Sequence, residues 1–149
     1  MDGKRLTVLS LNQANEIVAA AMAAGQEHGF APLCVVVLDP GGHALALQRD
    51  ERASISRPEI ATGKAAGCLG MGFGGRELAK RAQAVPGFFT ALASIFPKGI
   101  VPVAGGVLIR DQPGNLLGAI GVSGDTSDND EICAVAGIQA VGLVADTGA

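Results

Sequence analysis

The chain has 149 residues, with 11 Lys and Arg against 14 Asp and Glu, and a formal net charge of −3. This length predicts one domain over residues 1–149, with a core large enough to fold without disulfides or a structural metal. The basic residues are scattered, which argues against nucleic acid as a partner because phosphate binding needs clustered Lys and Arg.

No run approaches the ~18 apolar residues of a membrane span, and the N-terminus, with Asp2, Lys4 and Arg5, has no apolar signal core. We therefore expect no membrane contact and a cytoplasmic location.

Cysteine usage and hydropathy refine this expectation. Cys34, Cys68 and Cys133 are odd in number, far apart and embedded in apolar runs, which is typical of reduced, buried thiols in a cytosolic protein. The mean hydropathy of +0.37, combined with 22 glycines, indicates closely packed backbones and more apolar surface than one small domain can bury. Such a surface favours a homo-oligomer.

The N-terminal third predicts a helix followed by a hairpin. Ser10 and Gln13 have the spacing of a capping box, so a helix should cover residues 11–28 and end at Gly29. Residues 33–38 form a continuous, β-branched apolar run, residues 39–42 are turn formers, and residues 43–49 return as the partner strand. Both strands are expected to be buried between helices.

The middle of the chain predicts short helices around a glycine-rich corner. An Ala-rich helix is expected over residues 58–69, and two shorter helices over 77–84 and 88–96, separated by Pro86-Gly87. Residues 70–75 superficially match a dinucleotide-binding loop, but they follow a helix instead of a strand. We therefore interpret them as a flexible corner that lets helix and sheet approach closely.

The last third predicts a second hairpin and a final helix. Two apolar runs flank Pro113-Gly-Asn, and the small residues Gly105 and Gly106 should leave backbone amides bare to hold a ligand. A helix is expected over residues 127–144, with Ser127 and Asp130 as its capping box. Because tight turns join both strand pairs, the sheet should be mostly antiparallel with helices on both faces.

Few side chains in the sequence carry obvious chemistry. Arg57 lies at a helix start, where it could hold an anionic group together with the helix amides or form a solvated charge pair. Lys64 could add a second positive charge to that site, or its side chain could extend to solvent from an exposed helix face. His28 and His43 are candidates for haem ligation or acid–base chemistry. The alternative interpretation is a favourable interaction with the helix dipole for His28 and an ordinary surface position on a strand for His43. The acidic run 125–131 is explained by helix capping, and no metal site is expected.

These segments together resemble the GlcG/HbpS family of haem-binding-like proteins, which also includes the C-terminal domain of PduO-type proteins. The matching segments are residues 37–49, 60–65, 103–107, 118–125 and 128–131. The resemblance implies an α+β fold, namely a profilin-like three-layer α/β/α domain with a five-stranded, mostly antiparallel sheet, that assembles into dimers and often octamers. Some members bind haem and serve in redox sensing or haem handling, whereas others accompany catabolic enzymes. Haem is thus the cofactor that the resemblance implies.

The leading functional hypothesis is a cytoplasmic, oligomeric binding protein for haem or a similar flat, anionic molecule. Arg57 or Lys64 would meet the propionate-like charges of that ligand. Its apolar wall would come from four phenylalanines, Phe73, Phe88, Phe89 and Phe96.

The alternative is a catabolic enzyme of the lyase, isomerase or hydrolase type that acts on a small carboxylated substrate. Glu59 or His43 would then transfer the proton and Arg57 would clamp the carboxylate, while the amides of Gly105 and Gly106 would stabilise developing negative charge. A third hypothesis, a purely structural partner-binding module, predicts no saturable small ligand.

Overall fold

The computed structural model describes residues 9–149, so the charged residues Asp2, Lys4 and Arg5 lie outside the described part. The helices are α1 (Leu11–His28), α2 (Arg57–Met71), α3 (Gly75–Ala84), α4 (Pro86–Leu92) and α5 (Ser127–Ala140). The strands are β1 (Cys34–Leu38), β2 (Ala44–Arg49), β3 (Gly106–Arg110), β4 (Leu116–Ser123) and β5 (Val144–Asp146). The strands form one sheet in the order β2-β1-β4-β3-β5, with every neighbouring pair antiparallel.

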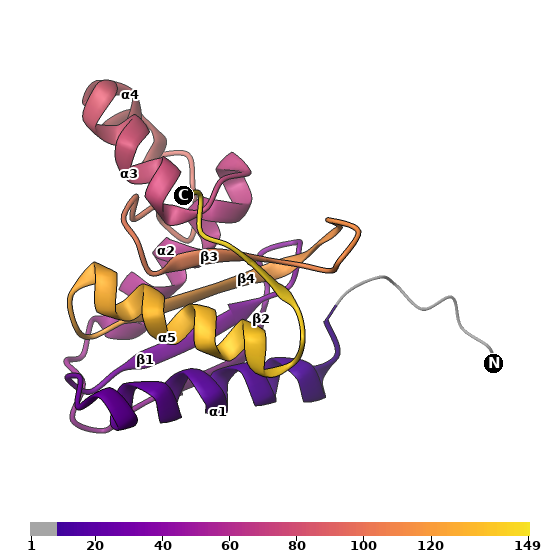
Figure 1. The fold of residues 1–149 in the computed structure, drawn as a ribbon. Helices are drawn as coiled ribbons and strands as arrows, with labels where there is room; N and C mark the ends of the chain where they lie inside the picture. The colour runs from indigo at the N-terminus through magenta and orange to yellow at the C-terminus, as the bar shows by residue number, and fades with distance from the viewer. Residues whose placement is uncertain (1–8) are drawn as a thin grey trace.

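The sheet lies between two helical layers, with α1 and α5 on one face and α2 on the other (Figure 1). Alternation along β1 explains both layers, because successive side chains of a strand point to opposite faces. Val35 and Val37 join the buried cluster under α1 and α5, whereas Val36 and Leu38 join the cluster under α2. The expected α+β architecture with a five-stranded antiparallel sheet is confirmed.

Helix α1 has the predicted boundaries and the predicted cap. The Ser10 hydroxyl accepts from the Gln13 amide, and the Gln13 side chain accepts from the Ser10 amide. Gly29 ends the helix in the left-handed region, at φ 69°. Ala21 and Ile17 pack against Gly137 of α5, where a Cβ would lie 2.6 Å from the Ile17 backbone oxygen, so glycine sets the close approach of the two helices.

The first hairpin differs from the expectation in one strand. All five residues of β1 are buried, as predicted, but every residue of β2 is exposed or half-buried. The expectation that both strands are covered was wrong because β2 is the edge of the sheet and pairs only with β1 among the described strands.

The short helices also shift from their predicted positions. Helix α2 continues to Met71, where Gly72 ends it at φ 80°. Helices α3 and α4 are separated at Val85, whose φ of −134° is not helical, and not at the predicted Pro86-Gly87. Proline fits the first turn of a helix, since its missing N–H has no partner there in any case, so Pro86 begins α4 instead of preceding it.

The C-terminal helix is shorter than predicted and has a different cap. Thr126, not Ser127, is the N-cap, and its side chain accepts from the Asn129 amide. The helix ends at Ala140 and Gly142 adopts φ 73°, after which β5 pairs with β3. The predicted helix, which ran to residue 144, was therefore too long by four residues and overlapped the first residue of the fifth strand.

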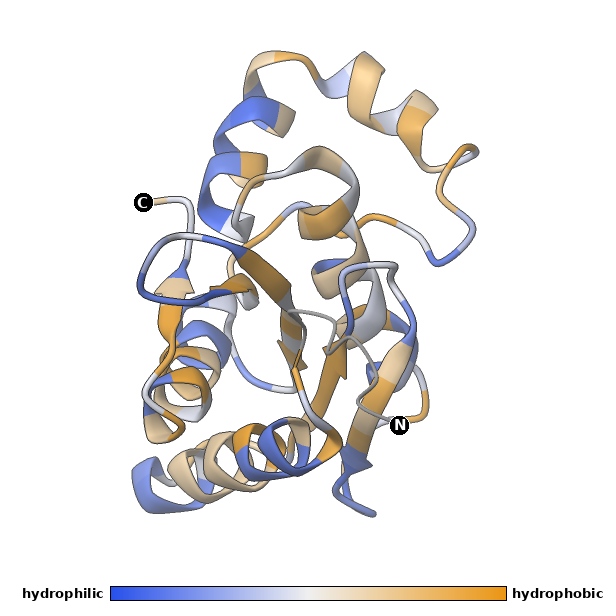
Figure 2. Cartoon of the chain, turned by 90° about the vertical axis from the view of Figure 1, so that its right-hand side faces the viewer, coloured by the Kyte–Doolittle hydropathy of each residue, from blue (hydrophilic) through white to orange (hydrophobic). Residues whose placement is uncertain are grey.

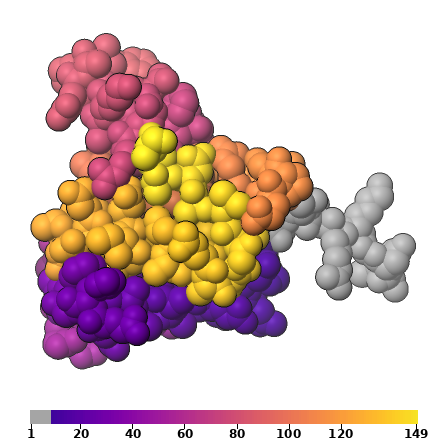
Figure 3. Space-filling view, viewed as in Figure 1, coloured from indigo at the N-terminus to yellow at the C-terminus, as the bar shows by residue number. Residues whose placement is uncertain are grey.

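Helices α3 and α4 project from the body as an arm, which lies above the sheet in Figure 1 and appears as the magenta to pink projection at the top of Figure 3. Figure 2 shows hydrophilic colouring on much of α3 and hydrophobic colouring on α4. Phe89 and Leu92 are buried, but Val85, Phe88 and Ile95 remain 48%, 54% and 69% exposed. Within residues 9–149, no helix combines the length and apolar character needed to cross a membrane.

Candidate functional site

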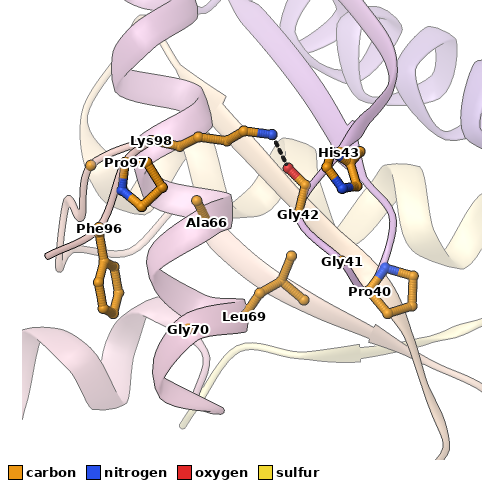
Figure 4. Close-up of a pocket in the computed structure, with 11 residues that line it drawn as sticks. Pro40, Gly41, Gly42, His43, Ala66, Leu69, Gly70, Phe96, Pro97 and Lys98 are labelled. Carbon is orange, nitrogen blue, oxygen red and sulfur yellow. Dashed lines mark hydrogen bonds between the residues drawn. The ribbon is translucent and has the colours of Figure 1, made fainter.

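A groove of about 360 Å³ lies between the turn that joins β1 to β2, one face of α2 and the segment 96–99 (Figure 4). Its lining residues are Pro40, Gly41, Gly42, His43, Ala66, Leu69, Gly70, Phe96, Pro97, Lys98 and Gly99. Most of these side chains are apolar, and the chemistry of the groove is confined to one imidazole and one ammonium group.

His43 stands on a turn that hydrogen bonds hold in shape. The Asp39 carboxylate accepts from the Gly41 and His43 amides at 2.9 and 3.0 Å, and the Asp39 amide donates to the His43 carbonyl at 2.8 Å. Gly42 has φ 86°, a conformation that L side chains rarely adopt, so glycine is required there. The exposed imidazole makes no hydrogen bond with any residue that the structure describes, which leaves its nitrogens available to a ligand.

The opposite wall is a stripe on α2. Ala66, Leu69 and Gly70 are spaced i, i+3 and i+4, so they share one helix face. A Cβ on Gly70 would lie 2.6 Å from the Phe96 ring, so the absence of a side chain allows Phe96 to lie directly on the helix. This side of the groove therefore has no side chain at Gly70 and an aromatic ring at Phe96.

A second groove of about 420 Å³ adjoins the first. It is lined by Leu38, Ala44, Pro58, Glu59 and Thr62, together with Pro97 and Lys98, which line both grooves. The Lys98 ammonium donates to the Gly42 carbonyl and so connects the segment 96–99 to the β1–β2 turn. Glu59 and His43, the two predicted proton-transfer candidates, thus lie in neighbouring grooves.

The two predicted cations lie elsewhere. The Arg57 guanidinium donates to Ser123 Oγ at 2.9 Å and to Ser54 Oγ at 3.1 Å. Lys64 is buried, and its ammonium donates to the Val122 carbonyl at 2.9 Å and to Asp130 Oδ2 at 3.0 Å. The interpretation of Lys64 as a solvent-exposed side chain is therefore wrong, and neither cation lines the two grooves.

Gly105 and Gly106 are buried under α2. A Cβ on Gly106 would lie 2.6 Å from the Lys64 carbonyl oxygen and 2.8 Å from Cys68 Sγ, so these glycines let the helix lie close to the sheet. Neither lines the two grooves, and their binding of a ligand stays a prediction.

Of the four phenylalanines expected to form an apolar wall, only Phe96 lines the groove. Phe73 lies beneath the Arg81 guanidinium, 4.1 Å from its ring centroid, and Phe89 is in the core. Phe88 is exposed on the arm and meets Phe89 edge to face. The structure therefore does not gather them around one site.

His28 stacks on Phe30, with ring centroids 4.9 Å apart. The chain enters β1 shortly after His28, whereas His43 follows the end of β1, so the two histidines lie toward opposite ends of that strand. His28 does not line the groove. Among residues 9–149, no three His, Cys, Asp or Glu side chains converge as a metal site would require.

Residues 97–99 are the part of the site that sequence reasoning missed, although Phe96 beside them was predicted to form an apolar wall. Pro97-Lys-Gly has the residue types of a helix end, and these types do not indicate a ligand site. The available signal was the set Gly63, Gly67 and Gly70, which share one face of α2 at helical spacing. Their missing side chains indicate that bulky groups lie against this face.

The fold and groove define a three-layer α/β/α protein with an open, mostly apolar groove beside a sheet edge. Residues 9–139 match the family described as haem degrading protein HbpS-like, and the chain belongs to this family. No curated protein matches the chain significantly.

Solved structures agree with this assignment. The PduOC:heme complex has a TM-score of 0.82 and 26% identity, over 93% of this chain and 99% of that one. A double mutant of Streptomyces reticuli HbpS has a TM-score of 0.80 and 30% identity, over 95% of this chain and 92% of that one. The Klebsiella pneumoniae protein ORFY, at 24% identity, has a TM-score of 0.80 over 94% of each chain and supports the fold alone.

Proposed function

We propose that this protein binds haem in the groove between His43 and Phe96. The observation that carries the proposal is the presence of an unengaged imidazole on the wall of an apolar groove, in a chain of the HbpS-like family. The similarity to the PduOC:heme complex over nearly the whole chain supports the same ligand.

The residues of the groove suit this ligand. Its volume of about 360 Å³ lies within the ~300–1,000 Å³ typical of small-molecule sites, and the adjoining groove extends it. Leu69 and Phe96 would cover a flat apolar ring, and His43 would ligate the iron, since histidine is a usual axial ligand. Haem would supply the iron chemistry, while the chain supplies the apolar walls and the axial nitrogen.

The proposal is tested by titrating the protein with haemin and following the Soret band. Wild type should give a saturable band, and H43A should lose it or shift it to that of unligated haemin. H28A is the matched control, because His28 stacks on Phe30 away from the groove, and it should titrate like wild type.

Two outcomes would count against the proposal. A wild-type protein that leaves the haemin spectrum unchanged would remove haem as the ligand. An H43A spectrum identical to that of wild type would remove His43 as the axial ligand and move attention to His28.

We further propose that the protein acts in the cytoplasm as a homo-oligomer, from dimer to octamer. Three unpaired cysteines suit a reducing compartment. Residues 82–97 contain no charged residue, and the exposed Val85, Phe88 and Ile95 lie within this stretch, so a second copy of the chain would cover them. Sedimentation should show a smaller assembly for F88S/I95S than for wild type, and an unchanged distribution would argue against this interface.

The enzyme hypothesis has less support. Glu59 and His43 line different grooves, and the other residues that it needs, Arg57, Gly105 and Gly106, line neither. No cavity combines the predicted proton-transfer group with the predicted carboxylate clamp among the grooves described.

A further inference from the structure

We propose that Lys98 determines the preference of the His43 groove for ligands with a carboxylate, by exchanging the Gly42 carbonyl for the carboxylate of the ligand. This inference rests on the proposed function and assigns the side chain that recognises the anionic edge of the ligand. The two cations expected for this role, Arg57 and Lys64, lie outside the groove.

Lys98 is well placed for the role. Among the eleven lining residues, all within the described part of the chain, Lys98 alone carries a formal charge at neutral pH. Its ammonium reaches across the groove to the β1–β2 turn, as Figure 4 shows. An anionic ligand that enters beside His43 therefore finds its one formally charged partner of the lining in this ammonium.

The present partner of Lys98 is a weak competitor. The Gly42 carbonyl is neutral, and no carboxylate of residues 9–149 lies within ion-pair distance of the Lys98 ammonium. The Lys98–Gly42 bond carries a charge on its donor alone, whereas a ligand carboxylate would bring a full opposite charge to the ammonium. The added Coulomb attraction favours the carboxylate over the neutral carbonyl. Gly42 is only half-buried, so water can satisfy its carbonyl after the exchange.

The exchange also has a geometric consequence. Within the structure described, the Lys98–Gly42 bond is the one hydrogen bond that joins residues 39–43 to residues 96–99. Lys98 and Pro97 line both grooves, so movement of the lysine opens the first groove toward the second. Glu59 lines the second groove and repels a carboxylate, which keeps the anionic edge of the ligand close to Lys98.

The test compares haemin with haemin dimethyl ester, which lacks both free carboxylates, at one cosolvent concentration. Wild type should bind haemin more tightly than the ester. K98Q removes the charge and keeps a donor, so it should weaken haemin binding about five- to tenfold and leave ester binding within about twofold. K98R should retain the preference, and K80Q, a matched loss of charge on α3 outside both grooves, should behave like wild type.

Each outcome has one meaning. A preference for haemin that K98Q abolishes and K98R retains supports the inference. Equal affinities of wild type for haemin and ester, or a preference that K98Q leaves intact, would overturn it while haem binding itself stands. Failure of wild type to bind either porphyrin would overturn the proposed function instead.

Discussion

Lys64 and Asp130 belong to helices on opposite faces of the sheet, yet the Lys64 ammonium lies 3.0 Å from Asp130 Oδ2. Both side chains are almost fully buried, with 4% and 1% of their surfaces exposed. The pair is completed by backbone groups, since Lys64 also donates to the Val122 carbonyl and Asp130 Oδ1 accepts from the Asp125 amide. It therefore links α2, β4 and α5 at one end of the sheet.

Removal of either partner should destabilise the fold strongly. K64M or D130N leaves an uncompensated buried charge, which typically costs about 3–5 kcal/mol. Urea unfolding at pH 7 measures the loss. Because the penalty comes from the orphaned charge, K64M/D130N should cost clearly less than the sum of the two single changes. Single variants that lose less than about 1 kcal/mol would contradict the pair's role in stability.

The hydrogen bonds of Asp125, which lies between β4 and α5, predict that the fold loses stability in acid. Hydrogen bonds from the Ala31 amide, then the Thr126 amide and the Asn129 side chain, lower the pKa of Asp125 below its ordinary value of 3.8. A lowered folded-state pKa stabilises the fold above the ordinary value, and this contribution is lost as pH falls through the folded-state pKa. Wild type should therefore exceed D125N in stability at pH 7, and the difference should shrink toward pH 3. Urea unfolding across this range measures it, and a constant difference would refute the assignment.

The contact between α2 and β4 at Gly121 leaves no room for a side chain. A Cβ at this position would overlap the backbone oxygen of Ala61, which cannot move without shifting the helix. Overpacking of this kind typically costs about 1–3 kcal/mol, so G121A should lower the urea midpoint. G87A is the control, because a Cβ there meets nothing within 4 Å and alanine favours a helix. Equal effects of the two substitutions would contradict the packing argument.

The three cysteines should be unreactive in the folded protein. Burial raises the pKa of Cys34 and Cys133 to about 11 and that of Cys68 to about 12, and nearby carboxylates add to the effect on Cys68 and Cys133. Few thiolates then exist at pH 8, and the thiolate is the reactive form. Ellman's reagent should label the native protein very slowly and all three thiols in guanidinium chloride. Rapid native labelling would show that the core opens readily.

Sequence reasoning succeeded where local chemistry decides the structure. Helix α1 has its cap, its boundaries and its terminal glycine within a contiguous stretch, so Ser10, Gln13 and Gly29 sufficed. It failed for β5, because Val144–Asp146 is too short to show alternation and is defined only by its pairing with β3. The exposure of β2 was missed for a related reason, since strand order depends on long-range pairing.

The candidate site was harder to predict than the fold. His43 was recognised as a residue able to ligate iron, but the groove around it joins segments that are remote in sequence, namely the β1–β2 turn, α2 and residues 96–99. The solvent-exposed interpretation of Lys64 was wrong because neither its charge nor its position in the helix reveals that its ammonium pairs with Asp130, which belongs to a helix on the other face of the sheet. Residue type thus indicated the chemistry, whereas the partners of each residue required the tertiary structure.

The separation of the buried residues into two clusters has an evolutionary consequence. The α1–α5 side holds one set of side chains and the α2 side holds the other, with the sheet between them. Substitutions that reshape the groove along α2 perturb only the second set, so the first can preserve foldability. Descendants of one ancestral scaffold could in this way acquire different small-molecule specificities while the buried cluster under α1 and α5 stays unchanged.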